Sequence, residues 1–289
     1  MIAFIAAIAV AAAPVAHRKV VTEDGAALAL YRYGTGEKPV LFVVDFGFDR
    51  TLAEPLATYL AERGRLVYVA ELRGQGASSP GMSLRSVVHL DFAALQRAIG
   101  TRVDLIAHGY AGSLALAAAG HELDVRKVVA FSTPMIPEPP TELQEWLLSN
   151  GARFSSLDAE TFDQLFAMQS KANPLQLSEL RRTGTRDLSR AMASELLAWL
   201  KTGDLPLDDG TTVLRRLRGY ERPTLMFLGL ANAWAPSEAC VILREFAPGD
   251  VRLRSFSRFS NGDDFAHVTL LMGALAPTLV FPDAEAFLR

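Results

Sequence analysis

Strand-like and helix-like segments alternate along most of this chain, and this alternation limits its fold more than any other feature. The strand-like segments are short apolar runs, several of them rich in β-branched residues: Val40–Phe46, Arg65–Leu72, Arg102–His108, Arg126–Ser132, Arg222–Leu230 and Asp250–Arg258. Helical patterns separate several of these runs, as at Leu52–Arg63 and Leu84–Ile99. Because parallel strands need long crossover connections, this order predicts an α/β fold, with a mostly parallel central sheet flanked by helices.

Two further segments divide the chain. Residues around Asp24–Gly25 alternate between apolar and polar side chains on both sides of a turn signal, which predicts a β-hairpin. Residues 134–221 begin with a proline-rich stretch and then show helical patterns without a convincing buried strand, so they are predicted to form an inserted helical cap. The α/β core would then consist of residues 17–133 and 222–289. The prolines concerned are Pro134, Pro137, Pro139 and Pro140.

Composition excludes several classes of function. The 289 residues carry a formal net charge of −3 with scattered lysines and arginines, so we expect no nucleic-acid partner. The single cysteine, Cys240, rules out an internal disulfide and a cysteine-rich metal site. The five histidines are dispersed and offer no pair at i, i+4 spacing. We therefore predict no metal and no cofactor, and we interpret Cys240 as a core residue.

The first sixteen residues, MIAFIAAIAVAAAPVA, form an apolar N-terminal segment. No basic residue precedes the apolar run of residues 1–13, and this run is too short to span a bilayer comfortably. Three interpretations stay open: a weak signal peptide, an anchor that contacts a membrane, and an extension of a cytoplasmic protein. The cytoplasm is slightly favoured over export or anchoring. The sequence predicts no oligomeric state.

Several motifs occur in an order that carries a family resemblance. AHGYAG follows a strand-like run, ELRGQGASSPG follows another, and GDDFAHVTLL comes late in the chain. Together they resemble the α/β-hydrolase superfamily. Within this superfamily, bacterial lipases and esterases of the acid-lipase type are resembled by two further segments, LAWLKTGDLPLDDG and HVTLLMGALAPTLVFP. The resemblance implies a nucleophile on a strained strand-to-helix turn, a histidine base, an acid that orients the base, and backbone N–H donors for an oxyanion.

The nucleophile position of this turn, called the elbow, is occupied by Gly109. Glycine accepts the strained backbone without steric cost, but it supplies no hydroxyl. Ser113 lies one helical turn further on, where we interpret it as a packing residue. His108 and Tyr110 flank the tip of the turn and are predicted to line a pocket.

The resemblance assigns the base to His267, in the loop after the last predicted strand. The acid position falls on Asn232, whose amide can hydrogen-bond an imidazole but brings no charge to stabilise the protonated ring. Three carboxylates elsewhere stay open as spatial substitutes for this acid: Glu138, Asp263 and Asp264.

The oxyanion loop also departs from the family pattern. Within one residue, Val44-Asp45 lies where the family has a His-Gly or Pro-Gly dipeptide, and Phe46 follows where the family has an aromatic residue. Asp45 and Phe46 are predicted to line the binding site, and a carboxylate at this place would repel a developing oxyanion. Three of the four catalytic elements are therefore changed, and only His267 is retained.

These substitutions lead to the hypothesis of a catalytically degenerate hydrolase-fold protein. It would bind a small apolar or acyl ligand, or a protein partner, between the sheet and the cap. Two alternatives stay open. One is an active enzyme in which His267 serves as a general base without an acyl-enzyme. The other is an ordinary esterase or lipase whose nucleophile is another residue.

Overall fold

A computed structural model describes residues 16–167, 174–247 and 249–289 of the chain. Among them, eight strands form one sheet in the order β1-β2-β4-β3-β5-β6-β7-β8. β1 pairs antiparallel with β2, and β2 with β4, whereas all the other pairs are parallel. The strands are β1 (Ala16–Val21), β2 (Ala27–Tyr33), β3 (Pro39–Val43), β4 (Leu66–Glu71), β5 (Val103–His108), β6 (Val125–Phe131), β7 (Thr224–Gly229) and β8 (Val251–Phe256).

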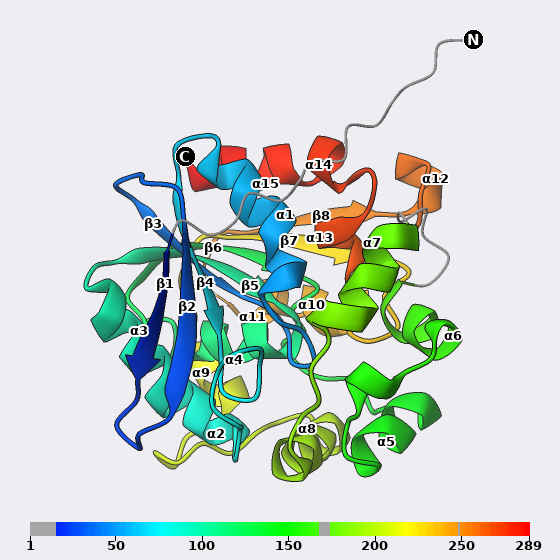
Figure 1. Cartoon of the computed structure of the whole chain (residues 1–289), viewed down its shortest axis with the longest axis horizontal. Helices are drawn as coiled ribbons and strands as arrows, with labels where there is room; N and C mark the ends of the chain where they lie inside the picture. Colours follow the sequence, from blue (N-terminus) through cyan, green and yellow to red (C-terminus); the bar gives the residue numbers. More distant parts are fainter. Residues whose placement is uncertain (1–15, 168–173, 248) are drawn as a thin grey trace.

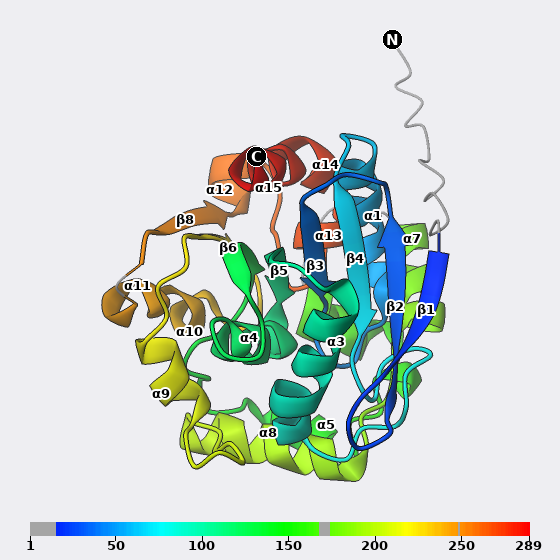
Figure 2. The ribbon, with the colours of Figure 1, turned by 90° about the vertical axis from the view of Figure 1, so that its left-hand side faces the viewer.

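Helices cover both faces of this sheet, so the predicted α/β class is confirmed (Figures 1 and 2). α1, α14 and α15 lie on one face, and α3, α4 and α9 lie on the other. The helices of the sheet part are α1 (Arg50–Ala61), α2 (Leu84–Ser86), α3 (Phe92–Ile99), α4 (Gly109–Ala118), α10 (Ser237–Val241), α11 (Leu243–Phe246), α12 (Arg258–Asn261), α13 (Thr269–Met272), α14 (Ala276–Leu279) and α15 (Phe281–Leu288). The antiparallel hairpin around Asp24–Gly25 is present as β1 and β2, with Gly25 at φ +81°.

Two elements differ from their predictions by more than a shift of one or two residues at their ends. β3 ends at Val43, three residues before the predicted end at Phe46, because the chain turns there and carries Asp45 and Phe46 towards the start of α4. The helix predicted over Leu84–Ile99 is interrupted by a π-helical turn at Val87–Asp91. Asp91 in that turn accepts hydrogen bonds from the backbone and guanidinium of Arg73, which holds the loop after β4 against the helix.

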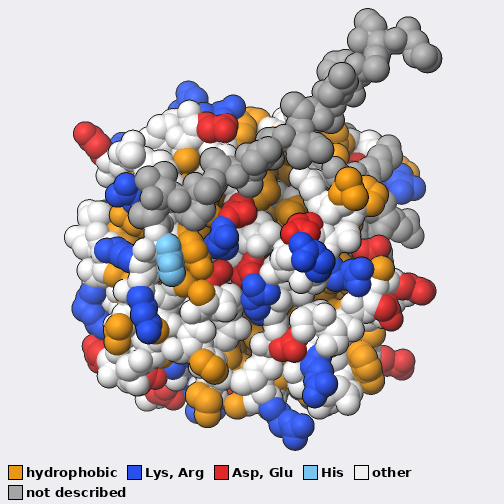
Figure 3. Space-filling model, in the orientation of Figure 1, with side chains coloured by type: hydrophobic (Ala, Val, Ile, Leu, Met, Phe, Trp, Pro, Cys, Tyr) orange, Lys and Arg blue, Asp and Glu red, His pale blue; other side chains and the backbone are white. Residues whose placement is uncertain are grey.

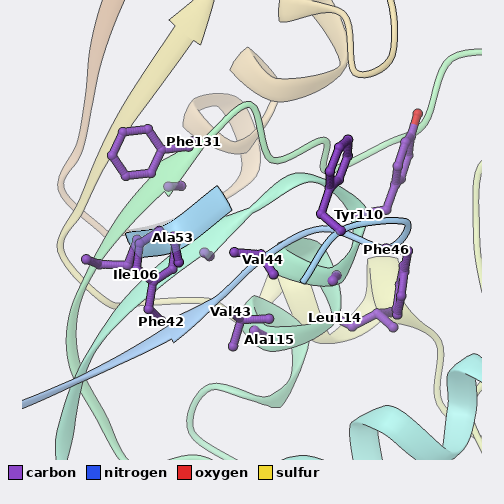
Figure 4. Packing of buried hydrophobic residues seen from close by; sticks show 14 of the residues in the cluster. Phe42, Val43, Val44, Phe46, Ala53, Ile106, Tyr110, Leu114, Ala115 and Phe131 are labelled. Carbon is purple, nitrogen blue, oxygen red and sulfur yellow. The ribbon is translucent and has the colours of Figure 1, made fainter. Parts of the chain in front are cut away.

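The central strands are apolar on both faces because both faces are covered, as expected for parallel strands. All five residues of β3 and all six of β5 are buried. Figure 4 shows side chains from β3, β5, β6 and the neighbouring helices packed into one continuous core. This core fixes the carboxyl ends of β3 and β5, from which the loops of the candidate site emerge.

The segment between β6 and β7 is helical, and no strand occurs among its described residues. Its α-helices are α5 (Glu142–Ser149), α6 (Ala159–Phe162), α7 (Pro174–Glu179), α8 (Arg190–Thr202) and α9 (Val213–Arg218). The proline-rich stretch before α5 forms neither helix nor strand, and Thr141 caps α5 with a capping box. The division into a core and a separate cap stays a prediction.

The outer surface mixes charges of both signs. On the face shown in Figure 3, basic and acidic side chains are interspersed. The apolar segment of residues 1–16 lies outside the described part of the chain except for Ala16, where β1 begins. In the described part, none of the helices has the length and apolar character needed to cross a membrane.

Candidate active site

The site lies where β5 turns into α4. Gly109 begins the helix with φ +60°, a conformation that side chains with a Cβ rarely adopt. A Cβ on Gly112 would approach the carbonyl carbon of Ala107 to 2.9 Å, so small residues are needed for strand and helix to lie this close. The Ser113 hydroxyl is fully buried and faces the carbonyl oxygens of Gly109 and Pro134, consistent with a packing role.

The carboxylate of Asp45 occupies the space beside Gly109 where a nucleophile side chain would begin. A Cβ built on Gly109 would lie 2.1 Å from both Cγ and Oδ2 of Asp45, closer than any real contact. The elbow therefore has no room for a side chain while Asp45 stays in place. A side chain at residue 109 and the Asp45 carboxylate in its present position therefore exclude each other.

Asp45 also takes the backbone donors of this region. Its Oδ1 accepts hydrogen bonds from the N–H of Phe46, in the loop after β3, at 2.8 Å and from the N–H of Ala111, in the first turn of α4, at 2.9 Å. Its Oδ2 accepts a hydrogen bond from Trp234 Nε1 at 2.9 Å. The loop after β3 is one of the two places from which α/β hydrolases donate to an oxyanion, and the positive end of α4 adds to the stabilisation of the negative charge. The carboxylate of the chain itself thus engages the Phe46 N–H, a donor of the kind that a substrate oxyanion would use.

His267 contacts both Asp45 and Asn232. Its Nε2 lies 3.0 Å from Asp45 Oδ2, although the geometry is not that of a well-aligned hydrogen bond. Its Nδ1 lies 3.3 Å from Asn232 Nδ2. The Asn232 amide is oriented by its oxygen, which accepts hydrogen bonds from the N–H groups of Trp234 and Ala235. Asn232 therefore presents its NH₂ group to His267.

This arrangement fixes the tautomer of His267. Since Asn232 donates to Nδ1, the proton of the neutral imidazole is on Nε2, next to Asp45. A triad histidine has the opposite tautomer, with the proton on Nδ1 towards the acid and a free Nε2 towards the nucleophile. With the proton on Nε2, the ring cannot accept a proton at the face that would meet a nucleophile.

His108 ties the two loops of the site together. Its Nδ1 accepts a hydrogen bond from the N–H of Asp45 at 3.3 Å, and its Nε2 donates to the carbonyl oxygen of His267 at 3.1 Å. The two imidazole rings lie 4.2 Å apart. Gln75 adds a second restraint, because its NH₂ group donates to the carbonyl oxygen of Asp45 at 2.8 Å. His108 thus acts as a structural link between β5 and the two loops.

Burial controls the protonation of these groups. It raises the pKa of Asp45 to about 6, against the opposing effects of His108 and of the backbone donors. Burial lowers the pKa of His267 to about 3, and burial together with the neighbouring His267 lowers the pKa of His108 to about 3. Near neutral pH the site holds one carboxylate and two neutral imidazoles.

Aromatic rings from the loop after β3 and from the segment between β6 and β7 cover the site. Phe162 and Phe166 come from the segment between β6 and β7, and both pack edge-on against Phe48, three residues after Asp45 in the chain. The Phe166 ring also lies 6.0 Å from the His267 ring and 5.2 Å from the Trp234 ring. Asp45 and His267 are both fully buried, with 0% of their surface exposed. A ligand could touch them only after these rings move.

The remaining candidate residues lie around this centre. Tyr110 is buried and donates a hydrogen bond to the carbonyl oxygen of Trp234, and it borders a surface cavity of about 260 Å³ that Glu138 also lines. Asp264 forms an ion pair with Arg258. Asp263 is buried and accepts a hydrogen bond from the N–H of Asp264.

Trp234 is the important residue that sequence reasoning missed. Its indole N–H binds Asp45, and its backbone N–H orients Asn232. Its position two residues after Asn232 is the only sequence signal for this role. Among the residues that the structure describes, no group of three or more histidine, cysteine, aspartate or glutamate side chains could hold a metal ion.

The sheet order, the strand-to-helix elbow at Gly109 and the histidine that follows the last strand define the architecture of an α/β hydrolase. A family model described as "Alpha/beta hydrolase family" matches residues 40–284. The chain belongs to this family.

Solved structures with the same fold include enzymes. An esterase from Thermogutta terrifontis is 21% identical, with 95% of this chain and 98% of that chain covered and a TM-score of 0.70. An esterase from Exiguobacterium antarcticum is 19% identical, with 94% and 96% covered and a TM-score of 0.69. A hydrolase from Pseudomonas aeruginosa is 21% identical, with 93% and 96% covered and a TM-score of 0.67. At these identities the similarity shows the fold alone. No curated protein matches the chain.

Proposed function

We propose that this protein is a catalytically degenerate α/β hydrolase that acts by binding rather than by hydrolysing esters. The observation that carries the proposal is the position of Asp45. Its carboxylate stands 2.1 Å from where a Gly109 side chain would begin and accepts hydrogen bonds from the N–H groups of Phe46, in the loop after β3, and Ala111, in the first turn of α4. An acyl-enzyme needs both of these places, one for the nucleophile and one for the oxyanion.

The state of His267 supports the same proposal. A general base for ester hydrolysis needs a free nitrogen that faces the reacting hydroxyl or water. Here Nδ1 faces Asn232 and Nε2 faces Asp45, inside a shell of aromatic rings. The low pKa of His267, about 3, further weakens the ring as a base near neutral pH.

The binding partner in this proposal is a small, largely apolar ligand or another protein. Because Asp45, His108, Gly109, Tyr110 and His267 are buried, such a ligand would meet the protein outside the catalytic centre. The esterases with a similar fold give no guide to its identity, because their similarity is limited to the fold.

The proposal is tested with short and medium p-nitrophenyl esters and with a fluorophosphonate probe that labels activated serines. The expected result is no turnover above that of the Asp45→Asn and His267→Gln variants, and no change in mass after treatment with the probe. A Ser113→Ala variant serves as the control for labelling at Ser113, which lies in the second turn of α4. Turnover that His267→Gln abolishes, or stoichiometric labelling that Ser113→Ala abolishes, would contradict the proposal.

A further inference from the structure

A second cavity, of about 400 Å³, lies beside α8. It lies between α8, the start of α2 and the loop that joins α8 to α9. α2 and α8 are in contact at the lower edge of the molecule in Figure 1. Its volume falls in the range of small-molecule sites, about 300–1,000 Å³. The lining residues are Arg85, Glu195, Ala198, Trp199, Thr202, Asp204, Leu205, Pro206 and Thr212.

Both walls of this cavity are held by internal hydrogen bonds. On one wall, Glu195 of α8 accepts hydrogen bonds from the hydroxyl of Ser83 and the N–H of Leu84, which fixes the start of α2. On the other wall, Asp204 accepts from the N–H groups of Leu205 and Leu214. The cavity is therefore largely formed in advance, and its two lining carboxylates already have donors.

Two lining residues, Trp199 and Arg85, have hydrogen-bond donors that lack acceptors in the described part of the chain. Trp199 is 1% exposed, yet its indole Nε1 has no acceptor among the described residues. Among the described residues the Arg85 guanidinium has no hydrogen-bond partner at Nε, and its ion pairs with carboxylate oxygens of Glu195 and Asp208 are long, at 3.9 Å. A buried donor without a partner is costly, so a group that brings an acceptor to this place is favoured.

Charge narrows the class of ligand. The lining holds one arginine and two carboxylates, and Asp208 lies close to the arginine. An anionic ligand would meet an excess of negative charge, whereas a neutral acceptor would not. Leu205, Pro206, Ala198 and the Trp199 ring supply apolar surface for the rest of the molecule.

We propose that this cavity binds a small, neutral, mainly apolar molecule through a carbonyl group that accepts a hydrogen bond from Trp199. This inference rests on the proposed function and names the site of its ligand. It places that ligand next to the closed catalytic centre and not in it: the Trp199 ring packs edge-on against Tyr110 at 5.8 Å, and Tyr110 follows Gly109.

The test uses three probes of similar shape. Acetophenone carries a neutral carbonyl, α-methylstyrene replaces that oxygen with carbon, and benzoate carries a charge. Binding is followed by the indole N–H signals of the three tryptophans in ¹⁵N-labelled protein, with Trp199→Phe used to assign one of them. We expect acetophenone to shift the Trp199 signal in a saturable way and the Trp146 signal not at all. We expect α-methylstyrene to bind at least about threefold more weakly, the effect of one net hydrogen bond, and benzoate to bind more weakly than acetophenone.

Two helix variants provide the matched control. Ala198 and Ala191 are both exposed on α8, but only Ala198 lines the cavity. Ala198→Phe should abolish the binding of acetophenone, while Ala191→Phe should leave it unchanged, with folding of both verified from the same spectra. Trp199→Phe, for which binding is followed by the backbone amide signals of α8 in the same spectra, should bind acetophenone and α-methylstyrene with the same affinity.

Three results would overturn the inference. These are the absence of a saturable shift at Trp199, equal binding of acetophenone and α-methylstyrene by the unmodified protein, and tighter binding of benzoate. None of them bears on ester turnover, so failure of this inference and failure of the proposed function are separate outcomes.

Discussion

Replacing Gly109 with serine is expected to destabilise the protein far more than its backbone conformation alone requires. The new Cβ would lie 2.1 Å from Cγ and Oδ2 of Asp45. Asp45 would have to move away from the N–H groups of Phe46 and Ala111 and from Trp234 Nε1, all of which are buried. The cost therefore has two parts, one from the backbone and one from the displaced carboxylate.

The size of each part follows from known effects. A non-glycine residue at φ +60° costs about 1–2 kcal/mol. Overpacking adds about 1–3 kcal/mol, and the loss of a hydrogen bond to a charged group adds about 1.5–3 kcal/mol. Gly109→Ser alone should thus lower the free energy of unfolding by about 3.5–8 kcal/mol. In an Asp45→Gly background only the backbone part remains, so the two substitutions should show a coupling energy of about 2.5–6 kcal/mol.

Urea denaturation followed by circular dichroism measures all four members of this cycle. Gly100→Ser is the matched control, because Gly100 has φ +77° and a Cβ there would meet no atom within 4 Å. It should lose only the backbone part. If Gly109→Ser does not fold, its recovery by Asp45→Gly gives the same information. Additive effects of the two substitutions would refute the claim that Asp45 occupies the place of the elbow side chain.

Three further predictions concern the same centre. The triple variant Gly109→Ser, Asn232→Asp, Asp45→Gly should hydrolyse p-nitrophenyl esters, and its gain in rate should exceed the product of the gains of the three single variants, because triad residues act as a unit. A folded Gly109→Ser variant that hydrolyses these esters as fast as the triple variant would contradict this. Trp234→Phe should lower the free energy of unfolding by about 1.5–3 kcal/mol in denaturant titrations, since it removes the indole donor from Asp45 Oδ2 and leaves that oxygen without a well-aligned hydrogen bond; a loss below about 0.5 kcal/mol, the scale of a neutral surface change, would count against that role. Because burial lowers the pKa of His267 to about 3, the contribution of His267 to stability should rise between about pH 3 and pH 6.5. Asp45 partly offsets this rise, because its raised pKa of about 6 acts in the opposite direction. The urea midpoints of His267→Gln should therefore depend less on pH than those of the unmodified protein, and an equal dependence would disprove this.

The sequence predicted the architecture well because that architecture depends on local and repetitive signals. Continuous apolar runs identify strands such as β3 and β5, which are covered on both faces, and the Asp24–Gly25 turn identifies the hairpin. The end of β3 was predicted three residues too late, because Val44 and Phe46 are apolar and continue the strand pattern into the loop. Apolar residues that pack a loop cannot be told from those of a buried strand by pattern alone.

The site was predicted only in part because its key contacts join residues far apart in the chain. The order of motifs indicated the positions of Gly109, Asn232 and His267. It could not show that Asp45 turns inward onto the elbow, which depends on hydrogen bonds to Ala111 and Trp234 across 66 and 189 positions. The direction of the Asn232 amide likewise depends on backbone N–H groups that only the folded loop brings together.

Whether Asp45 and Asn232 together hold the centre in a non-catalytic state is tested most directly by the tautomer of His267. Long-range ¹H–¹⁵N NMR spectra at neutral pH distinguish a ring that is protonated at Nε2 from one that is protonated at Nδ1. Donation from Asn232 to Nδ1 and the closeness of Nε2 to Asp45 predict a neutral ring with its proton on Nε2. A proton on Nδ1 with a free Nε2, the tautomer of a working triad, would contradict the arrangement on which the proposed loss of catalysis rests.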